Sequence, residues 1–193
     1  MKNIAVFCGS SEGYDEQHRD MAYQLGAVLA EKSIGIIYGG GKIGLMGAVA
    51  DGALANGGKV IGVIPSFLEN KEISHEGVTE MIVVETMHQR KLKMNDLCDG
   101  VITLPGGWGT MEEFFEMLTW GQLGLHKKPL AILNVNGFYD SLNVLFSTMV
   151  QEGFLQECTR NTLLISDSID ELLELMHNYT PPETPKYINR QTT

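Results

Sequence analysis

Pro105-Gly106-Gly107-Trp108-Gly109-Thr110-Met111-Glu112-Glu113 is the stretch that decides the fold, because it joins a predicted strand to a predicted helix. The apolar run 101–104 precedes it, and apolar residues at helical spacing follow from 114. We therefore expect a strand to end at Pro105 and a helix to begin near Thr110. The glycines let backbone amides approach a ligand closely, and a new helix offers free N–H groups and a positive dipole end to a phosphate. The two carboxylates in the first turn indicate that a cation or a proton is also handled here.

A purely structural explanation exists for two of these residues. Thr110 and Glu113 have the spacing of a capping box, in which each side chain satisfies a backbone donor of the other at a helix start. A lone capping box is structural far more often than catalytic. The three glycines, the strand end and a second glycine loop elsewhere favour a functional site.

Length and charge restrict the class of protein. The 193 residues suit one domain with a substantial core. Hydrophobic residues make up 44% and the mean hydropathy is −0.02, which is typical of a soluble globular protein. With 14 basic and 24 acidic side chains the formal net charge is −10. No general nucleic-acid surface is expected, because that requires a basic face; a small phosphate ligand in one focused pocket remains compatible.

Cysteine and histidine positions predict neither a disulfide framework nor a metal site. Cys8, Cys98 and Cys158 are odd in number and lack C-x-x-C spacing, and the histidines lack metal-type spacing. Cys8 and Cys98 lie in apolar stretches and are expected to be buried thiols. No metal and no cofactor are therefore expected.

The N-terminus predicts a strand rather than a targeting segment. Residues 1–7 lack the apolar region and cleavage site of a signal peptide, and no apolar run is long enough to span a bilayer. We expect a cytoplasmic protein with no membrane partner.

Buried β-branched runs alternate with amphipathic helical patterns along the chain. The predicted strands are 4–8, 34–38, 60–64, 80–84, 101–104, 129–134 and 163–165; the predicted helices are 15–32, 43–56, 86–98, one from about 110, 139–151 and 169–177. Residues 66–77 are expected to be a polar connection. This alternation is typical of right-handed βαβ units. We predict the α/β class, with a single doubly wound, mostly parallel, Rossmann-like sheet in one domain over 1–180. The tail 181–193 has three prolines and no periodicity, so we expect it to be loosely held.

Glycine or small residues follow three of the predicted strands, at Gly9-Ser10, Gly39-Gly40-Gly41 and Pro105-Gly106-Gly107. In open parallel sheets, ligands bind beyond the carboxyl ends of the strands, near the point where the strand order reverses. Ser10, Gly40 and Gly41 are therefore candidate substrate contacts beside the first stretch.

The segment 39–44 also matches G-x-G-x-x-G, the fingerprint of dinucleotide binding. It follows the second strand rather than the first, and no acidic residue lies about 20 residues further on to hold a ribose. A Walker A loop is excluded, because Leu45 and Met46 follow Gly44. We interpret the loop as a second backbone cradle, with a tight structural turn as the alternative.

The segment Met87-His88-Gln89-Arg90-Lys91 opens the helix before the central strand. Arg90 and Lys91 would usually form a solvated helix face. Arg90, however, offers a rigid fork of donors suited to phosphate or carboxylate, and Lys91 adds a point charge beside it.

The pattern P-G-G-x-G-T-x-x-E, with M-H-x-R-K before it, resembles the signature of the Lonely guy (LOG) family of cytokinin-activating phosphoribohydrolases, long mislabelled in bacteria as lysine decarboxylases. Similarity continues at 39–47, 119–124 and 134–139 and covers most of 1–155. The resemblance implies an enzyme that releases a free base and ribose 5-phosphate from a nucleoside 5′-monophosphate. It implies that Arg90 and Glu113 are the catalytic pair. It also implies that the substrate is surrounded by Glu72, Lys91, Gly107, Trp108, Gly109, Thr110, Met111, Glu112 and Thr119.

Such a reaction suits the carboxylates, because breaking an N-glycosidic bond develops positive charge on the ribose. Three alternatives remain: an NAD-dependent oxidoreductase, a non-catalytic nucleotide sensor, and a pyridoxal-phosphate decarboxylase, for which no Schiff-base lysine is marked. The sequence leaves open whether the base is adenine or an N6-prenylated adenine. It also leaves open how Glu112 and Glu113 divide their roles.

The helix after the glycines predicts a homodimer. Phe114-Phe115, Met117-Leu118 and Trp120 make it apolar on more than one face, and a second subunit would cover the face turned away from the sheet. Burial within the same domain is the alternative, and the family resemblance also favours at least a dimer.

Overall fold

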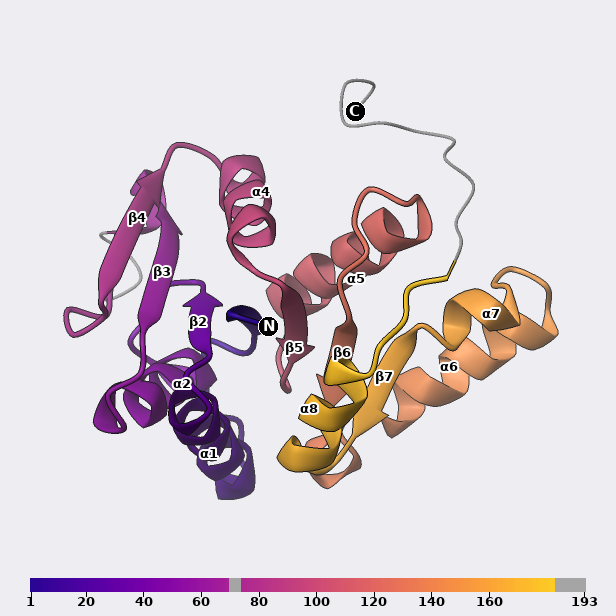
Figure 1. The fold of residues 1–193 in the computed structure, drawn as a ribbon, viewed down its shortest axis with the longest axis horizontal. Helices are drawn as coiled ribbons and strands as arrows, with labels where there is room; N and C mark the ends of the chain where they lie inside the picture. The colour runs from indigo at the N-terminus through magenta and orange to yellow at the C-terminus, as the bar shows by residue number, and fades with distance from the viewer. Residues whose placement is uncertain (70–73, 183–193) are drawn as a thin grey trace.

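All the strand pairings of the central sheet are parallel in the computed structural model, which describes residues 1–69 and 74–182. The seven strands lie in the order β4-β3-β2-β1-β5-β6-β7 (Figure 1). Their bounds are β1 Asn3–Phe7, β2 Gly35–Tyr38, β3 Val60–Pro65, β4 Glu80–Val84, β5 Gly100–Thr103, β6 Leu130–Leu133 and β7 Leu163–Ser166. The predicted fold class is confirmed, and the sheet is parallel throughout its described strands.

The strand order reverses between β1 and β5. From β1 the chain winds outward through β2 and β3 to β4, returns to β5 on the other side of β1, and continues outward to β6 and β7. Phe7 at the end of β1 pairs with Thr103 at the end of β5. The carboxyl ends of these two strands therefore form the switch point at which a ligand is expected.

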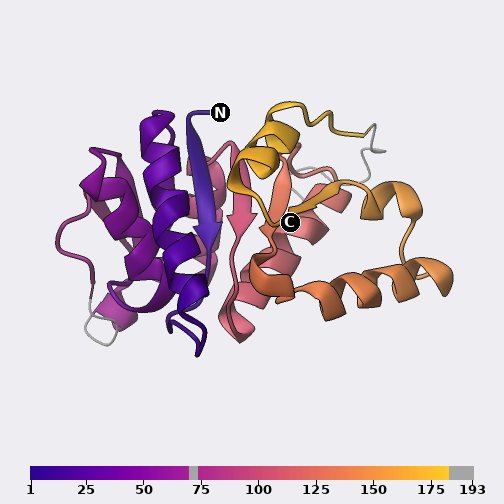
Figure 2. The same cartoon turned by 90° about the horizontal axis from the view of Figure 1, so that it is seen from below.

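Helices cover both faces of the sheet. Residues from α1 (Glu16–Glu31), α2 (Gly44–Ala55) and α8 (Ile169–His177) share one core cluster, and residues from α5 (Trp108–Gln122) and α6 (Asp140–Gln151) share the other with Met94 of α4 (Met87–Leu97). Figure 1 shows α1, α2 and α8 below the sheet and α4 and α5 above it. Seen from below in Figure 2, α1 and α2 lie side by side in front of the N-terminal strands.

Three short helices interrupt segments that were expected to be irregular. They are α3 (Ser66–Glu69) inside the expected polar connection, the 3-10 helix η1 (Val135–Gly137) and α7 (Glu157–Arg160). Each is at most one turn long, so no periodic pattern could reveal it. Helix α5 begins at Trp108, two residues before the predicted start at Thr110, and this difference affects the candidate site.

Two earlier expectations fall outside the described residues: the position of Glu72, and the state of residues 183–193 in the predicted tail. Within residues 1–69 and 74–182, none of the helices has the length and apolar character needed to cross a membrane.

Candidate active site

The ends of β1 and β5 are joined by main-chain hydrogen bonds just beyond the sheet. The Leu104 N–H donates to the Phe7 carbonyl (2.9 Å), and the Gly9 N–H donates to the Pro105 carbonyl (3.0 Å). The two glycine segments, Gly9-Ser10 and Pro105–Gly107, therefore lie side by side at the switch point. The sequence predicted this convergence.

Helix α5 begins without the capping box that its sequence suggested. Gly107 is the N-cap, in extended conformation, and makes no side-chain capping hydrogen bond. Thr110 is the third helical residue and is buried; a Cβ on Gly106 would lie 2.2 Å from its Oγ1. The capping-box interpretation of Thr110 and Glu113 is wrong, because the helix starts earlier and leaves both side chains inside it.

The start of α5 is open. Gly107 and Gly109 are exposed, and a Cβ built on either would meet no described atom within 4 Å. Trp108 between them is 92% exposed. Because the first N–H groups of a helix lack internal partners and carry the positive dipole end, this terminus suits a phosphate. Helices α1, α4 and α8, by contrast, are each capped by a side chain.

Arg90 is fixed inside the protein by two main-chain carbonyls. Its Nε donates to the Val63 carbonyl (3.1 Å) within β3, and its Nη2 donates to the Gly39 carbonyl (3.1 Å) after β2. The side chain is only 7% exposed. Gly39 leaves room for it, since a Cβ there would lie 2.1 Å from Nη2. The expectation of a solvated helix face is thus excluded for Arg90.

Arg90 and Glu113 meet across the gap between α4 and α5. Nη1 of Arg90 lies 3.9 Å from Oε1 of Glu113, whose side chain is 12% exposed. Cys8 lies near both charges: burial raises the pKa of its thiol, the Glu113 charge raises it further, and the Arg90 charge opposes this. Cys8 is therefore a buried thiol, as predicted, beside the charged pair.

Lys91 forms a second set of ion pairs next to the first. Its Nζ donates to Glu112 (2.5 Å) and to Glu116 (3.0 Å), and its side chain is buried. Burial acts to lower the pKa of Lys91, but the hydrogen bonds to Glu112 and Glu116 outweigh it, so the pKa is raised. Lys91 is a cation already paired with two carboxylates, whereas Glu112 keeps more than half of its side chain exposed.

The loop 39–44 is not an open second cradle. The first amides of α2, those of Leu45 and Met46, donate to the Gly9 carbonyl (3.0 and 3.3 Å), so they are not free for an anion. Gly40 and Gly41 are buried. The structure uses this loop to hold Arg90 through Gly39, which sequence reasoning missed because the partner is a main-chain carbonyl.

The remaining predicted residues are spread around this centre. Ser10 is exposed at the end of β1, and Met111 is half-buried on α5. Thr119 lies eleven residues beyond Trp108 on α5, roughly 16 Å along the helix axis. Its hydroxyl donates to the Phe115 carbonyl (2.8 Å). The structure therefore brings together Arg90, Lys91 and the 107–113 segment, but not Thr119 of the same chain.

Three supporting residues, Thr86, Gln89 and Tyr139, were not assigned a role from the sequence. At the start of α4, Thr86 accepts a hydrogen bond from the Gln89 N–H, and the Gln89 side chain accepts one from the Glu85 N–H. The helix start was predicted at residue 86, and the Thr-x-x-Gln spacing could have indicated these capping contacts as well. The Tyr139 hydroxyl donates to the Leu104 carbonyl (2.8 Å) and so fixes the chain just after β5. No sequence pattern around Tyr139 indicated this hydrogen bond.

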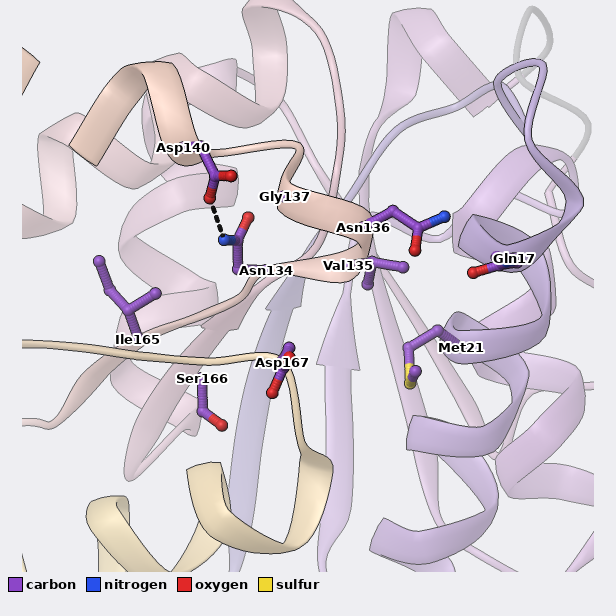
Figure 3. Close-up of a pocket in the computed structure, with 10 residues that line it drawn as sticks. All are labelled: Gln17, Met21, Asn134, Val135, Asn136, Gly137, Asp140, Ile165, Ser166 and Asp167. Carbon is purple, nitrogen blue, oxygen red and sulfur yellow. Dashed lines mark hydrogen bonds between the residues drawn. The ribbon is translucent and has the colours of Figure 1, made fainter. Parts of the chain in front are cut away.

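A polar cavity of about 540 Å³ lies elsewhere at the same edge of the sheet (Figure 3). Gln17 and Met21 of α1 face the 134–137 segment and the end of β7 across it, and Asn134 is bonded to Asp140. Its lining includes none of the residues predicted to bind substrate.

Comparisons with known proteins found similar sequences and similar solved structures. A family model described as "Possible lysine decarboxylase" matches residues 46–176. Cytokinin riboside 5′-monophosphate phosphoribohydrolase LOG2 of Arabidopsis thaliana is 44% identical over 180 residues, covering 93% of this chain and 84% of that protein. The phosphoribohydrolase LOG of Oryza sativa subsp. japonica is 43% identical over 180 residues, covering 93% and 74%. Among solved structures, the molybdenum cofactor binding protein of Rippkaea orientalis superposes with a TM-score of 0.69 at 25% identity, covering 91% of this chain and 94% of that one.

Proposed function

Because the chain belongs to the LOG family of cytokinin riboside 5′-monophosphate phosphoribohydrolases, we propose that it hydrolyses the N-glycosidic bond of adenosine 5′-monophosphate or an N6-modified form of it. The products are the free base and ribose 5-phosphate. The observation that carries this proposal is the Arg90–Glu113 pair, which meets beside the open N-terminus of α5 at the switch point.

Glu113 is the group that we assign to the positive charge that develops in the transition state. As the bond between the base and C1′ breaks, positive charge develops on the ribose. The carboxylate of Glu113 stabilises that charge or takes a proton from the attacking water. Water adds to C1′, and the base leaves with the bonding electrons and acquires a proton.

Arg90 acts on the substrate from a fixed position. Its two carbonyl partners hold the guanidinium in place before substrate arrives, so little reorganisation is needed during the reaction. Its Nη1 faces Glu113. We assign to Arg90 the anchoring of the substrate and the stabilisation of charge on the departing base.

The 5′-phosphate is assigned to the start of α5, with Gly107, Trp108, Gly109 and Thr110 around it. The protein is acidic overall, so an anionic substrate needs a local positive field, which the helix terminus and Arg90 supply. Contacts by Ser10, Gly40, Gly41, Glu72, Lys91, Met111 and Glu112 stay predictions.

A second copy of the chain is proposed to cover an apolar surface on α5 and α6. A groove of about 260 Å³ runs between Phe115, Phe146 and Phe154, and Phe154 is 87% exposed. Val144 and Leu145 are exposed on α6. Within the chain, Phe114 and Met117 are buried and Leu118 and Trp120 are partly buried, whereas Phe115 stays exposed, and this remaining apolar surface of α5 supports the homodimer. Thr119 lines this groove, where a partner subunit would lie. A cytoplasmic location stays a prediction from the sequence.

The test is to incubate the purified protein with AMP and to quantify adenine and ribose 5-phosphate by chromatography. Equal amounts of both products, rising with time and enzyme concentration, are expected. The fold also serves a cofactor binding protein, so a non-catalytic nucleotide-binding protein is the second candidate. That candidate would bind AMP and release no adenine over a long incubation, and such a result would replace the proposal.

A further inference from the structure

His75 makes four hydrogen bonds, two within its own turn and two to distant parts of the chain, although no role in the reaction has been given to it. Its backbone N–H donates to the Gly40 carbonyl (3.1 Å), its Nε2 lies 2.9 Å from Oδ1 of Asp51, and its Nδ1 lies 3.1 Å from the Gly77 nitrogen. The Val78 N–H lies 3.5 Å from its carbonyl. The ring is 8% exposed. We call residues 75–78 the His75 turn.

The hydrogen bonds define the tautomer of His75. Because the Gly77 N–H donates to Nδ1, Nδ1 carries no proton, and the proton of the neutral ring is on Nε2. Nε2 therefore donates to the carboxylate of Asp51. The neutral ring satisfies both partners at once.

Asp51 lies on helix α2, whose backbone is closely packed. Helix α2 packs against α1 with backbone contacts: a Cβ on Gly52 would lie 2.0 Å from the Tyr23 carbonyl oxygen, and one on Gly26 would lie 2.1 Å from the Val49 carbonyl oxygen. The Asp51 carboxylate itself is 59% exposed, so it is not part of the core. It can thus fix the His75 turn without being required for the fold.

The His75 turn is one peptide away from the anchor of Arg90. Gly39 accepts from Arg90 Nη2, and Gly40, the next residue, accepts from the His75 N–H. Gly41 pairs with Ser74 in an isolated antiparallel bridge. Gly40 has a φ of 84°, a conformation that glycine adopts readily. Because glycine can also adopt many other conformations, the directions of the Gly39 and Gly40 carbonyls depend on contacts with neighbouring residues.

We propose that Asp51 and His75 are positioning residues for the active site: they clamp the His75 turn onto Gly40 and so hold the Gly39 carbonyl, and with it Arg90, in the geometry that the reaction requires. Neither residue touches the substrate. The inference rests on the proposed function for its kinetic consequence, but the clamp itself can be tested without turnover.

Two substitutions separate the contacts of the clamp. Asp51→Ala removes the acceptor of Nε2–H. His75→Asn keeps an oxygen that can accept from the Gly77 N–H in an Asx turn but cannot reach Asp51. Asp51→Asn is the conservative variant, because its amide oxygen still accepts from Nε2–H. Asp20→Ala, which removes an exposed carboxylate from α1, is the matched control for charge.

The first readout is hydrogen exchange of the His75 and Gly77 amides in the full-length protein without substrate. We expect exchange at least about tenfold faster in Asp51→Ala, and close to wild type in Asp51→Asn and Asp20→Ala. Unchanged exchange in Asp51→Ala would overturn the clamp, whatever the protein catalyses.

The second readout is steady-state hydrolysis of AMP well below the unfolding temperature. Small displacements of a catalytic group can cost up to about a hundredfold in rate, so we expect kcat to fall about tenfold in Asp51→Ala and His75→Asn. KM should change less, and Asp51→Asn should recover most of kcat. Faster exchange with wild-type kcat in Asp51→Ala would assign the pair a merely structural role and overturn positioning. Absence of turnover in the wild type would instead refute the proposed function and leave the exchange result to decide the clamp.

Discussion

Replacing Glu113 with glutamine tests the assignment of the catalytic carboxylate. Glutamine has nearly the same shape, so the side chain can stay in its place between α4 and α5, but it has no charge and takes no proton at neutral pH. Because Glu113 is not part of a capping box, the substitution leaves the start of α5 untouched. Arg90 keeps its hydrogen bonds to the carbonyls of Val63 and Gly39. Folding should therefore survive.

The magnitude follows from the distance of 3.9 Å between Arg90 Nη1 and Glu113 Oε1. Two unit charges at that separation interact by about 4 kcal/mol at an effective dielectric constant of about 20. A cationic ribose at a similar distance would lose comparable stabilisation, and removal of a general base typically costs about 10²–10⁴-fold. We expect kcat to fall at least about 100-fold, or ~2.7 kcal/mol. The loss of stability should be smaller than the about 3–5 kcal/mol seen when a buried charge loses its partner entirely.

The assay is steady-state release of adenine from AMP, with thermal unfolding measured in parallel. Glu112→Gln is the control, because Glu112 is the adjacent carboxylate, is 54% exposed and is paired with Lys91 instead. Because Lys91 keeps its second ion pair, with Glu116, we expect the control to lose less than about fivefold in kcat, or ~1 kcal/mol. Glu113→Gln with at least half of the wild-type kcat would refute the assignment, and an equal loss in both variants would mean that the two carboxylates share the role.

Further substitutions test the surroundings of the pair. Arg90→Lys should lower kcat/KM at least about tenfold, or ~1.4 kcal/mol, because an ammonium cannot reach both carbonyls as the guanidinium fork does; a loss below twofold in steady-state kinetics would contradict this. Gly39→Ala places a Cβ 2.1 Å from Arg90 Nη2, so it should displace the guanidinium and reduce kcat about tenfold while costing about 1–3 kcal/mol by overpacking, as measured by kinetics and denaturant unfolding. The wild type should scatter light as a dimer and Phe154→Asp as a monomer, since Phe154 borders the exposed groove; a monomeric wild type would refute the proposed interface.

Most of the fold could be predicted because its strands and helices carry clear periodic signals. The glycines after β1, β2 and β5 indicated the ligand-binding edge of the sheet, whereas the reversal of strand order between β1 and β5 is seen only in the structure. The short helices α3, η1 and α7 escaped because one turn leaves no periodicity. The start of α5 was misplaced because Thr110 and Glu113 have the spacing of a capping box, whereas the tertiary structure buries Thr110 under Gly106.

The site could be predicted only in part, because contacts that depend on the packing of strands and helices leave no signal in the residue identities. Arg90 and Glu113 were assigned as a pair through the resemblance to the LOG family, and the structure brings them together. The hydrogen bonds from Arg90 to Val63 and Gly39 depend on carbonyl directions within β3 and just after β2, which residue identities do not reveal. The partners of Lys91, one helical turn apart on α5, likewise depend on how α4 and α5 pack.

The most direct test of the central claim is the ratio of kcat/KM for AMP to that for adenosine. The open start of α5, with Gly107 and Gly109 exposed, is assigned to the 5′-phosphate, which lies away from the bond that breaks. Binding energy from such a remote group can be used in the transition state, so adenosine should lose turnover as well as affinity. We predict a ratio of at least about 100, or ~2.7 kcal/mol. If the kcat/KM values for AMP and adenosine lay within about threefold of one another, the result would contradict the claim that this site acts as a phosphoribohydrolase.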